Sequence, residues 1–429
     1  MKGIKVTLAV AASALLLAAP AMAFHDGGVA QCESCHTMHN SVNGAKFTDT
    51  AKLGYAGLNQ YQAGPYLLLG ATQSEACLNC HESTPGSYHI STAAGTNNTA
   101  ASANGTITQF TPGGDFRWLT VKGQNYGHSI NAPAFGYTSA NLSAAPGGGA
   151  TPYPGASLAC SSCHDPHGKY RRTADTGYTW STTGAPIIGS GSYNNSKVPT
   201  SAQAVGAYRI LGGNGYQPKS TLGAGNLAFS ADPPTAVANS TYNASETTVQ
   251  GKRVAYGAGM SEWCANCHGT MHQDTYTSGQ TGAINVHPAG NGAKLTAAIA
   301  SNYQLYVSSG IMTGTAGTSS TSLVPFETGS SDFSGLRTVA NGDNTGADTS
   351  SNVMCLSCHR AHASGFSSMT RFGVVGFMTT DNGSGTTVYT TSTTAGSTNG
   401  DLQAAYNNRP ASLWPAYQRN LCNKCHAKD

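Results

Sequence analysis

The stretch CSSCH at residues 160–164 decides how this chain folds, because it is one of six copies of the pattern Cys-x-x-Cys-His. Two thiols at this spacing can add to the two vinyl groups of a haem, and the adjoining histidine then binds the iron as its proximal axial ligand. We number the copies motifs 1 to 6, and they lie at residues 32–36, 77–81, 160–164, 264–268, 355–359 and 422–426. The pattern therefore predicts six covalently attached haem c groups.

The six motifs use every cysteine in the chain. The predicted attachment residues are Cys32, Cys35, Cys77, Cys80, Cys160, Cys163, Cys264, Cys267, Cys355, Cys358, Cys422 and Cys425, and the proximal ligands are His36, His81, His164, His268, His359 and His426. Six disulfides or three four-cysteine zinc sites are the competing interpretations. Neither requires a histidine after each second cysteine. With 14 histidines in 429 residues, a chance histidine has a probability of roughly one in thirty per motif, which favours haem.

Residues 1–23 have the features of a secretory signal peptide. Lys2 and Lys5 precede an apolar run over residues 6–19, and residues 20–23 form a small-residue cleavage site. The run is too short to span a membrane, and no later stretch reaches the roughly 18 apolar residues that a spanning helix needs. We expect a mature chain, 24–429, that is exported through the periplasm, where haem is attached, and has no membrane span.

The composition is poor in the residues that build an ordinary core. Only 39% of residues are hydrophobic, 10% are charged, and 53 are glycine. This composition favours disorder unless a cofactor supplies buried surface, so we expect the chain without haem to be largely unfolded. The predicted fold is mostly irregular or loop structure with short helices and few short strands, in one elongated domain around a chain of six haems. We expect a helical turn at each motif, a longer helix over 294–308, and short strands over 206–211 and 374–379.

The charge of the chain gives little indication of its partners. The formal net charge is +3, but each haem brings two propionates, so the loaded protein is expected to be acidic. Basic residues are few and scattered, which argues against a nucleic-acid partner. Lys169, Arg171 and Arg172 form a short basic cluster that could pair with propionates or lie solvated at the surface.

The histidine count indicates how the irons are ligated. Eight histidines lie outside the motifs, and six distal ligands would give every iron two imidazoles. Two filled axial positions favour low-potential electron transfer over substrate binding. The preferred distal candidates are His39, His89, His128, His167, His287 and His362, with His25 and His272 as less favoured alternatives.

Motifs 1, 3 and 5 continue as His-x-x-His, which ends at His39, His167 and His362. Residues three apart lie on one face of a helical turn. The second histidine therefore cannot reach the opposite side of the iron that the first one binds. It must serve a different haem, which forces two haems close together.

Several stretches resemble a known family. These are FHDGGVAQCESCHTMHN (24–40), CSSCHDPHGKYRR (160–172), RVAYGAGMSEWCANCH (253–268), SNVMCLSCHRAHASGF (351–366) and LCNKCHAKD (421–429). They are similar to the hexahaem outer-surface c-type cytochromes of metal-reducing bacteria, which polymerise into conductive filaments. The resemblance implies bis-histidine haems in alternating parallel and T-shaped pairs. It also implies that His39 crosses to the neighbouring subunit and binds the haem attached through Cys355, Cys358 and His359. Such a head-to-tail ligand does not close on itself and builds a filament.

The leading functional hypothesis is an extracellular electron conduit, not an enzyme, at the outer cell surface. Its expected partners are identical subunits in a head-to-tail filament, extracellular electron acceptors such as minerals, electrodes or partner cells, and other multihaem cytochromes. A monomeric periplasmic or secreted electron shuttle is the first alternative. A multihaem oxyanion reductase is the second, and it requires an iron with an open position.

Overall fold

The computed structural model describes the parts of the chain that carry the six motifs. These are residues 32–36, 41–42, 45–46, 67–82, 90, 113–138, 141–174, 178–189, 198–218, 227–237, 254–273, 287–309, 324–342, 347–374, 378–381, 387–390, 417–418 and 421–426. All 12 cysteines lie within these ranges, whereas His25, His39 and His89 lie outside them.

Regular structure in the described residues is short and scattered, as the sequence predicted. The α-helices are α2 (Gln73–His81), α3 (Arg117–Val121), α4 (Met260–His268), α5 (Ala297–Ser309), α6 (Phe333–Gly342) and α7 (Cys355–Cys358). The 3-10 helices are η1 (Cys32–Ser34), η5 (Gln124–Tyr126), η6 (Pro133–Phe135), η7 (Gly155–Ser157), η8 (Cys160–Ser162), η9 (Tyr208–Ile210), η11 (Gly269–Met271), η13 (Ser367–Met369) and η15 (Cys422–Lys424).

The strands form small antiparallel sheets that join loops locally. The strands are β1 (Ser41–Val42), β2 (Ala45–Lys46), β3 (Arg171–Thr173), β4 (Thr179–Ser181), β5 (Val205–Gly206), β6 (Ala236–Val237), β7 (Ala255–Tyr256), β8 (Met378–Asp381), β9 (Thr387–Thr390) and β10 (Tyr417–Gln418). Their sheet orders are β1-β2, β4-β3-β5, β6-β7 and β10-β8-β9.

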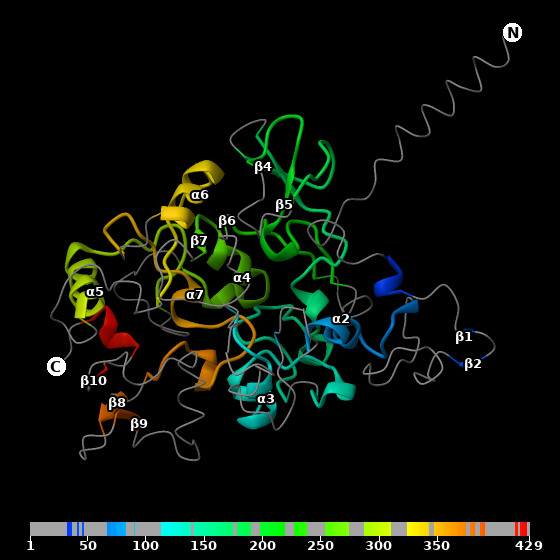
Figure 1. The fold of residues 1–429 in the computed structure, drawn as a ribbon, viewed down its shortest axis with the longest axis horizontal. Coiled ribbons are helices and arrows are strands. Elements are labelled where there is room, and N and C mark those ends of the chain that lie inside the picture. Colours follow the sequence, from blue (N-terminus) through cyan, green and yellow to red (C-terminus); the bar gives the residue numbers. More distant parts are fainter. Residues whose placement is uncertain are drawn as a thin grey trace, which may run out of the picture.

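The motifs follow one another along the long axis of the molecule. In Figure 1, η1 of motif 1 (blue) lies towards the right and η15 of motif 6 (red) lies towards the left, with α2, α4 and α7 between them. The chain therefore lays its cofactor sites out in a row rather than around one centre.

Three of the expected elements differ in position from the sequence prediction. The longer helix over 294–308 is confirmed as α5, but it begins at Ala297 because Thr296 accepts the Ile299 N–H at 3.3 Å with its hydroxyl and so caps the helix. The strand predicted over 206–211 ends at Gly206, and η9 follows it. The strand predicted over 374–379 is found at 378–381 as β8.

The buried apolar residues of the described chain form five small clusters instead of one core. Four of them include or contact a motif residue: Cys160, Cys267, Leu356 and Cys358 each belong to a different cluster. The remaining cluster packs Phe333 and Leu336 of α6 onto β6 and β7. The apolar packing is thus distributed among the cofactor sites.

Arg172 corrects one interpretation of the sequence. Its side chain is only 2% exposed, so it does not belong to a solvated surface cluster. The guanidinium donates to the Thr235 hydroxyl at 2.7 Å and to the Tyr178 and Ser331 carbonyls at 3.0 Å each, and it lies 4.9 Å from the Trp180 ring centre. Arg172 joins β3, β4 and the loop at residue 331.

Candidate haem sites

Each of the six motifs lies on a helical turn. In motifs 1, 3, 5 and 6 the histidine N–H donates to the carbonyl of the first cysteine, four residues back, at 2.9–3.0 Å. Motifs 2 and 4 form the C-terminal part of α2 and α4. A turn of this kind places both thiols and the imidazole on one side of the backbone, which a single porphyrin requires.

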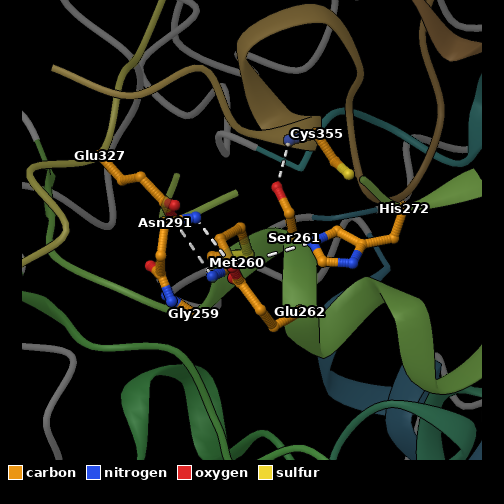
Figure 2. A network of polar contacts seen from close by, with 8 residues as sticks. All are labelled: Gly259, Met260, Ser261, Glu262, His272, Asn291, Glu327 and Cys355. Atoms are coloured by element: carbon orange, nitrogen blue, oxygen red, sulfur yellow. Dashed lines mark hydrogen bonds and ion pairs between the residues drawn. The ribbon is translucent and has the colours of Figure 1, made fainter. Parts of the chain in front are cut away.

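The first cysteines of consecutive motifs meet at two places. The thiols of Cys77 and Cys160 hydrogen-bond each other and so join motifs 2 and 3, and those of Cys264 and Cys355 join motifs 4 and 5 in the same way. A serine supports each contact, because the Ser74 hydroxyl accepts the Cys160 N–H at 3.2 Å and the Ser261 hydroxyl accepts the Cys355 N–H at 3.0 Å (Figure 2).

In the alternate intervals, the second cysteines of neighbouring motifs interact electrostatically. Burial is the largest cause that raises the pKa of the Cys35, Cys163 and Cys425 thiols. The next cause is electrostatic repulsion from the second cysteine of a neighbouring motif. The pairs are Cys35 with Cys80, Cys163 with Cys267, and Cys425 with Cys358. The first cysteines are therefore in contact in motif pairs 2–3 and 4–5. The second cysteines of pairs 1–2, 3–4 and 5–6 lie within electrostatic range of each other, and Cys422 also acts on Cys358.

Four motif histidines face a histidine from outside the motifs. The ring centres are 6.0–6.4 Å apart in these pairs, which we call opposed pairs. They are His36 with His167, His164 with His362, His268 with His128, and His426 with His287. An iron bound by two imidazole nitrogens at about 2 Å each holds the ring centres roughly 6 Å apart. The donor sets and their spacing therefore fit haem iron.

The opposed pairs follow a regular order along the chain. His167, the second histidine of motif 3, faces His36 of motif 1, and His362, the second histidine of motif 5, faces His164 of motif 3. In both cases the ligand comes from the odd-numbered motif that follows. His81 and His359 belong to none of the four opposed pairs.

Backbone carbonyls fix the orientation of several imidazoles. The Nδ1 atoms of His128, His164, His268, His287 and His359 lie 2.6–2.8 Å from the carbonyl oxygens of Ala361, Arg209, Pro146, Pro288 and Ser368, respectively. Such a bond places the proton on Nδ1 and leaves the Nε2 lone pair for a metal. Burial also lowers the pKa of His128 and of His164 to about 4 and that of His362 to about 3, which keeps these rings neutral.

Two of these carbonyls lie in strained turns. Arg209 and Ser368 have φ values of 55° and 56°, and the residue after each also has a positive φ. Non-glycine residues rarely adopt this conformation, which costs on the order of 1–3 kcal/mol. The turns bring a carbonyl under His164 and His359. The same requirement explains why the strand predicted over 206–211 stops at residue 206.

The distal sides of motifs 3 and 4 are joined by the backbone. His128 donates its N–H to the His362 carbonyl at 2.8 Å, and its Nδ1 lies 2.6 Å from the Ala361 carbonyl oxygen. Ala363 forms bridges to both Gly114 and Gly127. We call residues 361–363 the distal strap, since it positions one ligand directly and a second through hydrogen bonds.

Substituting Gly114 with alanine is expected to displace the distal strap. A Cβ at this position would overlap the Ala363 carbonyl oxygen, and the φ of 87° adds backbone strain. We expect the ferric protein to lose part of its low-spin signal and gain a high-spin signal in electron paramagnetic resonance. Gly123→Ala is the matched control, because Gly123 has a φ of 103° but open space around its Cβ position. Equal spectra for both variants would contradict the role of the strap.

The first turn of α4 is held by groups distant in sequence (Figure 2). The Glu327 carboxylate accepts the Met260 N–H at 3.3 Å, and the Asn291 amide oxygen accepts the Gly259 N–H at 3.0 Å. Acceptors at this end satisfy N–H groups that have no partner within the helix. His272, an alternative distal candidate, lies instead with its Nε2 3.8 Å from the Glu262 carboxylate.

Sequence reasoning missed the serines that join the motifs. The signal is present as a repeat, because Ser-Glu-x-Cys-x-Asn-Cys-His occurs at 74–81 and again at 261–268.

Within the described residues the structure forms no group of three or more side chains suited to a bound metal ion, and all 12 cysteines are free thiols. None of the helices in the described residues is long and apolar enough to cross a bilayer.

Comparison with known proteins shows strong similarity along the whole chain. The C-type cytochrome OmcS of Geobacter sulfurreducens is 51% identical over 455 residues, which covers 100% of both chains. The cryo-EM structure of the OmcS nanowires from Geobacter sulfurreducens matches with a TM-score of 0.78 and 49% identity, over 95% of this chain and 100% of that one. The outer membrane cytochrome S filament from the same organism gives a TM-score of 0.78, 48% identity and the same coverage. No family model matches the chain.

Proposed function

Because this chain belongs to the OmcS family of multihaem c-type cytochromes, we propose that it carries electrons along six covalently bound haem c groups and polymerises head to tail into an extracellular conductive filament. The opposed histidine pairs carry this proposal. Each pair would supply two imidazoles to one haem iron, and such ligation suits electron transfer rather than substrate binding. We therefore propose an electron conduit that is not an enzyme.

The residues of the chain supply position and environment. When bound, the haems supply reversible one-electron iron chemistry. The motif turns would attach each haem through two sulfurs and one imidazole. The hydrogen bonds between Nδ1 and backbone carbonyl oxygens fix the orientation of the imidazole rings. The alternating cysteine contacts bring consecutive motifs edge to edge. Electron transfer depends on this closeness of consecutive haem sites more than on any reacting side chain.

The order of the opposed pairs supports assembly between copies. The second histidine of motif 3 serves motif 1 and that of motif 5 serves motif 3, so the next histidine in the series belongs to motif 1 of another copy. That residue is His39, and by the same order it would bind the iron of motif 5, whose proximal ligand is His359. The exposure of Cys32 and Cys422 supports this assembly. The first cysteines of motifs 2 to 5 are half-buried in contacts with a neighbouring motif, whereas those of motifs 1 and 6 could make the same contact only with a second copy.

The same reasoning assigns a distal ligand to motif 2. His128 lies between motifs 2 and 3 and faces His268 of motif 4, and His287 lies between motifs 4 and 5 and faces His426 of motif 6. By extension of this series, a histidine that precedes motif 1 would serve the iron of motif 2, whose proximal ligand is His81. We therefore propose His25 in place of His89. His89 and His272, which closely follow their own motifs, are then the two histidines that bind no iron.

We further propose that the mature chain, 24–429, acts outside the cell as one domain. The secretory features of residues 1–23 and the outer membrane cytochrome filament formed by a relative support this. Identical subunits are its assembly partners, and extracellular oxidants and other cytochromes are its redox partners.

The test is to purify the holo-protein and examine it by negative-stain microscopy, size-exclusion chromatography and ferric-state spectroscopy. We expect filaments in the void volume, low-spin iron throughout, and current across dried filaments that disappears when haem is removed. A single small species at every concentration would favour the shuttle. High-spin iron in the resting protein would favour the reductase.

A further inference from the structure

Two loops of the described chain bring a histidine from between two motifs to a third one. We call 128–134 and 287–291 the ligand loops. The first begins at His128, lies between motifs 2 and 3, and presents its histidine to motif 4. The second begins at His287, lies between motifs 4 and 5, and presents its histidine to motif 6. The position of each histidine therefore depends on how its loop is held by the two motifs that flank it.

Both ligand loops bind the motif that follows them in the same register. Asn131 donates its N–H to the Leu158 carbonyl at 3.1 Å, and Gly290 donates its N–H to the Val353 carbonyl at 2.8 Å. Each donor lies three residues after the histidine of its loop, and each acceptor lies two residues before the first cysteine of the next motif. The two loops are thus structural equivalents, although the distances between motifs along the chain differ.

A glutamate of the preceding motif binds the far end of each loop. One carboxylate oxygen of Glu75 accepts the Ala134 N–H at 3.0 Å, and one of Glu262 accepts the Asn291 N–H at 2.7 Å (Figure 2). Both glutamates lie two residues before the first cysteine of their motif, within the repeated sequence Ser-Glu-x-Cys-x-Asn-Cys-His. A carboxylate forms stronger hydrogen bonds than a neutral acceptor does, so these bonds are suited to holding a loop in place.

A second hydrogen bond ties each loop to the start of the same helix. The Thr72 hydroxyl, at the start of α2, donates to the Asn131 carbonyl at 2.9 Å. At the start of α4, the Gly259 N–H donates to the amide oxygen of Asn291 at 3.0 Å (Figure 2). Two bonds between the same partners fix the orientation of a loop as well as its distance.

The residue before each glutamate holds the next motif. Ser74 and Ser261 are both 0% exposed, and their hydroxyls accept the N–H groups of Cys160 and Cys355. Within the Ser-Glu pair, the serine therefore acts on the following motif, whereas the glutamate acts on the loop that leads to the motif after it.

We propose that Glu75 and Glu262 are positioning residues for iron ligands two motifs away: Glu75 holds His128 at the iron of motif 4, and Glu262 holds His287 at the iron of motif 6. Hydrogen-bond partners that do not touch a metal still orient its ligands and affect how firmly they bind. A distal imidazole on a displaced loop leaves the iron with one imidazole, and that iron becomes high-spin. This inference rests on the proposed electron-transfer function, which needs both imidazoles.

The effect is expected to be larger for Glu262 than for Glu75. His128 is also bound directly by the distal strap, through its own N–H and its Nδ1. The Nδ1 of His287 lies instead 2.8 Å from the carbonyl oxygen of Pro288, the next residue of its own loop, so this contact does not anchor the loop.

The test is electron paramagnetic resonance of the ferric holo-protein, with the number of attached haems counted by mass spectrometry. We expect Glu262→Ala to give a high-spin signal of up to one haem in six. Glu262→Gln, whose amide oxygen can still accept the Asn291 N–H, should keep most of the low-spin signal. Asp332→Ala is the matched control, because this carboxylate accepts the Ser334 N–H at 2.9 Å at the start of α6 and contacts neither ligand loop. Its spectrum should equal that of the wild type.

A background without the haem of motif 6 identifies the affected iron. In the Cys422→Ala/Cys425→Ala variant, adding Glu262→Ala should produce no further high-spin signal. A further signal there would place the disturbance at another haem, such as that of motif 4, and would overturn the proposal.

A wild-type spectrum of Glu262→Ala with six haems attached would overturn the proposal as well. If the alanine variant carries fewer than six haems, Glu262→Asp, which keeps the charge but shortens the side chain, is judged by the same criteria. Either negative result leaves the conduit intact, since the wild-type protein would still show low-spin iron and filaments. High-spin iron in the wild-type protein would instead reject the proposed function itself.

Discussion

Replacing His39 with alanine is expected to abolish polymerisation while six haems stay attached to every subunit. In the proposed assembly this side chain provides an iron ligand at each junction between subunits. Its removal deletes a buried anchor, whose loss at other interfaces costs about 2–4 kcal/mol or more, equivalent to a fall of roughly thirty- to a thousand-fold in the association constant. Negative-stain microscopy should show no filaments, and chromatography should show a single small species.

The spectrum of the same variant provides an independent check. The iron at motif 5 would lose its sixth ligand, so one haem in six should become high-spin. His272→Ala is the matched control, because His272 lies beside Glu262 and belongs to none of the opposed pairs. It should form normal filaments with an unchanged spectrum. Filaments of ordinary length in the His39→Ala variant would show that the junction uses another ligand.

Removing all six haems is expected to unfold the described structure, which is a larger effect than any single substitution. The apolar residues form small clusters, and several of these are completed by motif residues such as Cys160, Cys267 and Cys358. Without the porphyrins, these clusters lack most of the surface that would bury them, as in small metalloproteins that fold only with their cofactor. The chain expressed without haem attachment should show a disordered circular dichroism spectrum and rapid proteolysis.

Removing one haem at a time tests which segments of the chain depend on which haem for their folding. Cys160→Ala/Cys163→Ala deletes a central haem, which lies between two neighbours, and should destabilise the segments on both sides. Cys422→Ala/Cys425→Ala deletes the haem of motif 6, which lies at one end in Figure 1, and should leave most of the chain protected. A haem-free chain that melts cooperatively would show that the polypeptide folds without its cofactors.

The sequence predicted the fold class and the helical turns at the motifs, because these follow from local spacing and composition. It could not predict which distal histidine faces which motif. His36 and His167 are distant in sequence, and their pairing depends on contacts between cysteines of successive motifs that no local pattern reveals.

The strained turns also escaped prediction. Arg209 lies in a stretch with the apolar pattern of a strand, and its positive φ is set by the need to place a carbonyl under His164. Likewise, Arg172 is charged and follows a motif, which suggests a surface position, yet the structure buries it among hydrogen-bond acceptors. In each case a tertiary requirement overrides the local preference of the sequence.

The alternation of cysteine contacts restricts how a protein of this design can change in length. Each motif has one edge at its first cysteine and one at its second, and each edge meets the same kind of edge on its neighbour. Insertion or deletion of one motif would set a first-cysteine edge against a second-cysteine edge and break the path at that point. Two motifs added or lost together would preserve it. Natural variation in such chains should therefore proceed by even increments, with the motif pair as the unit of duplication.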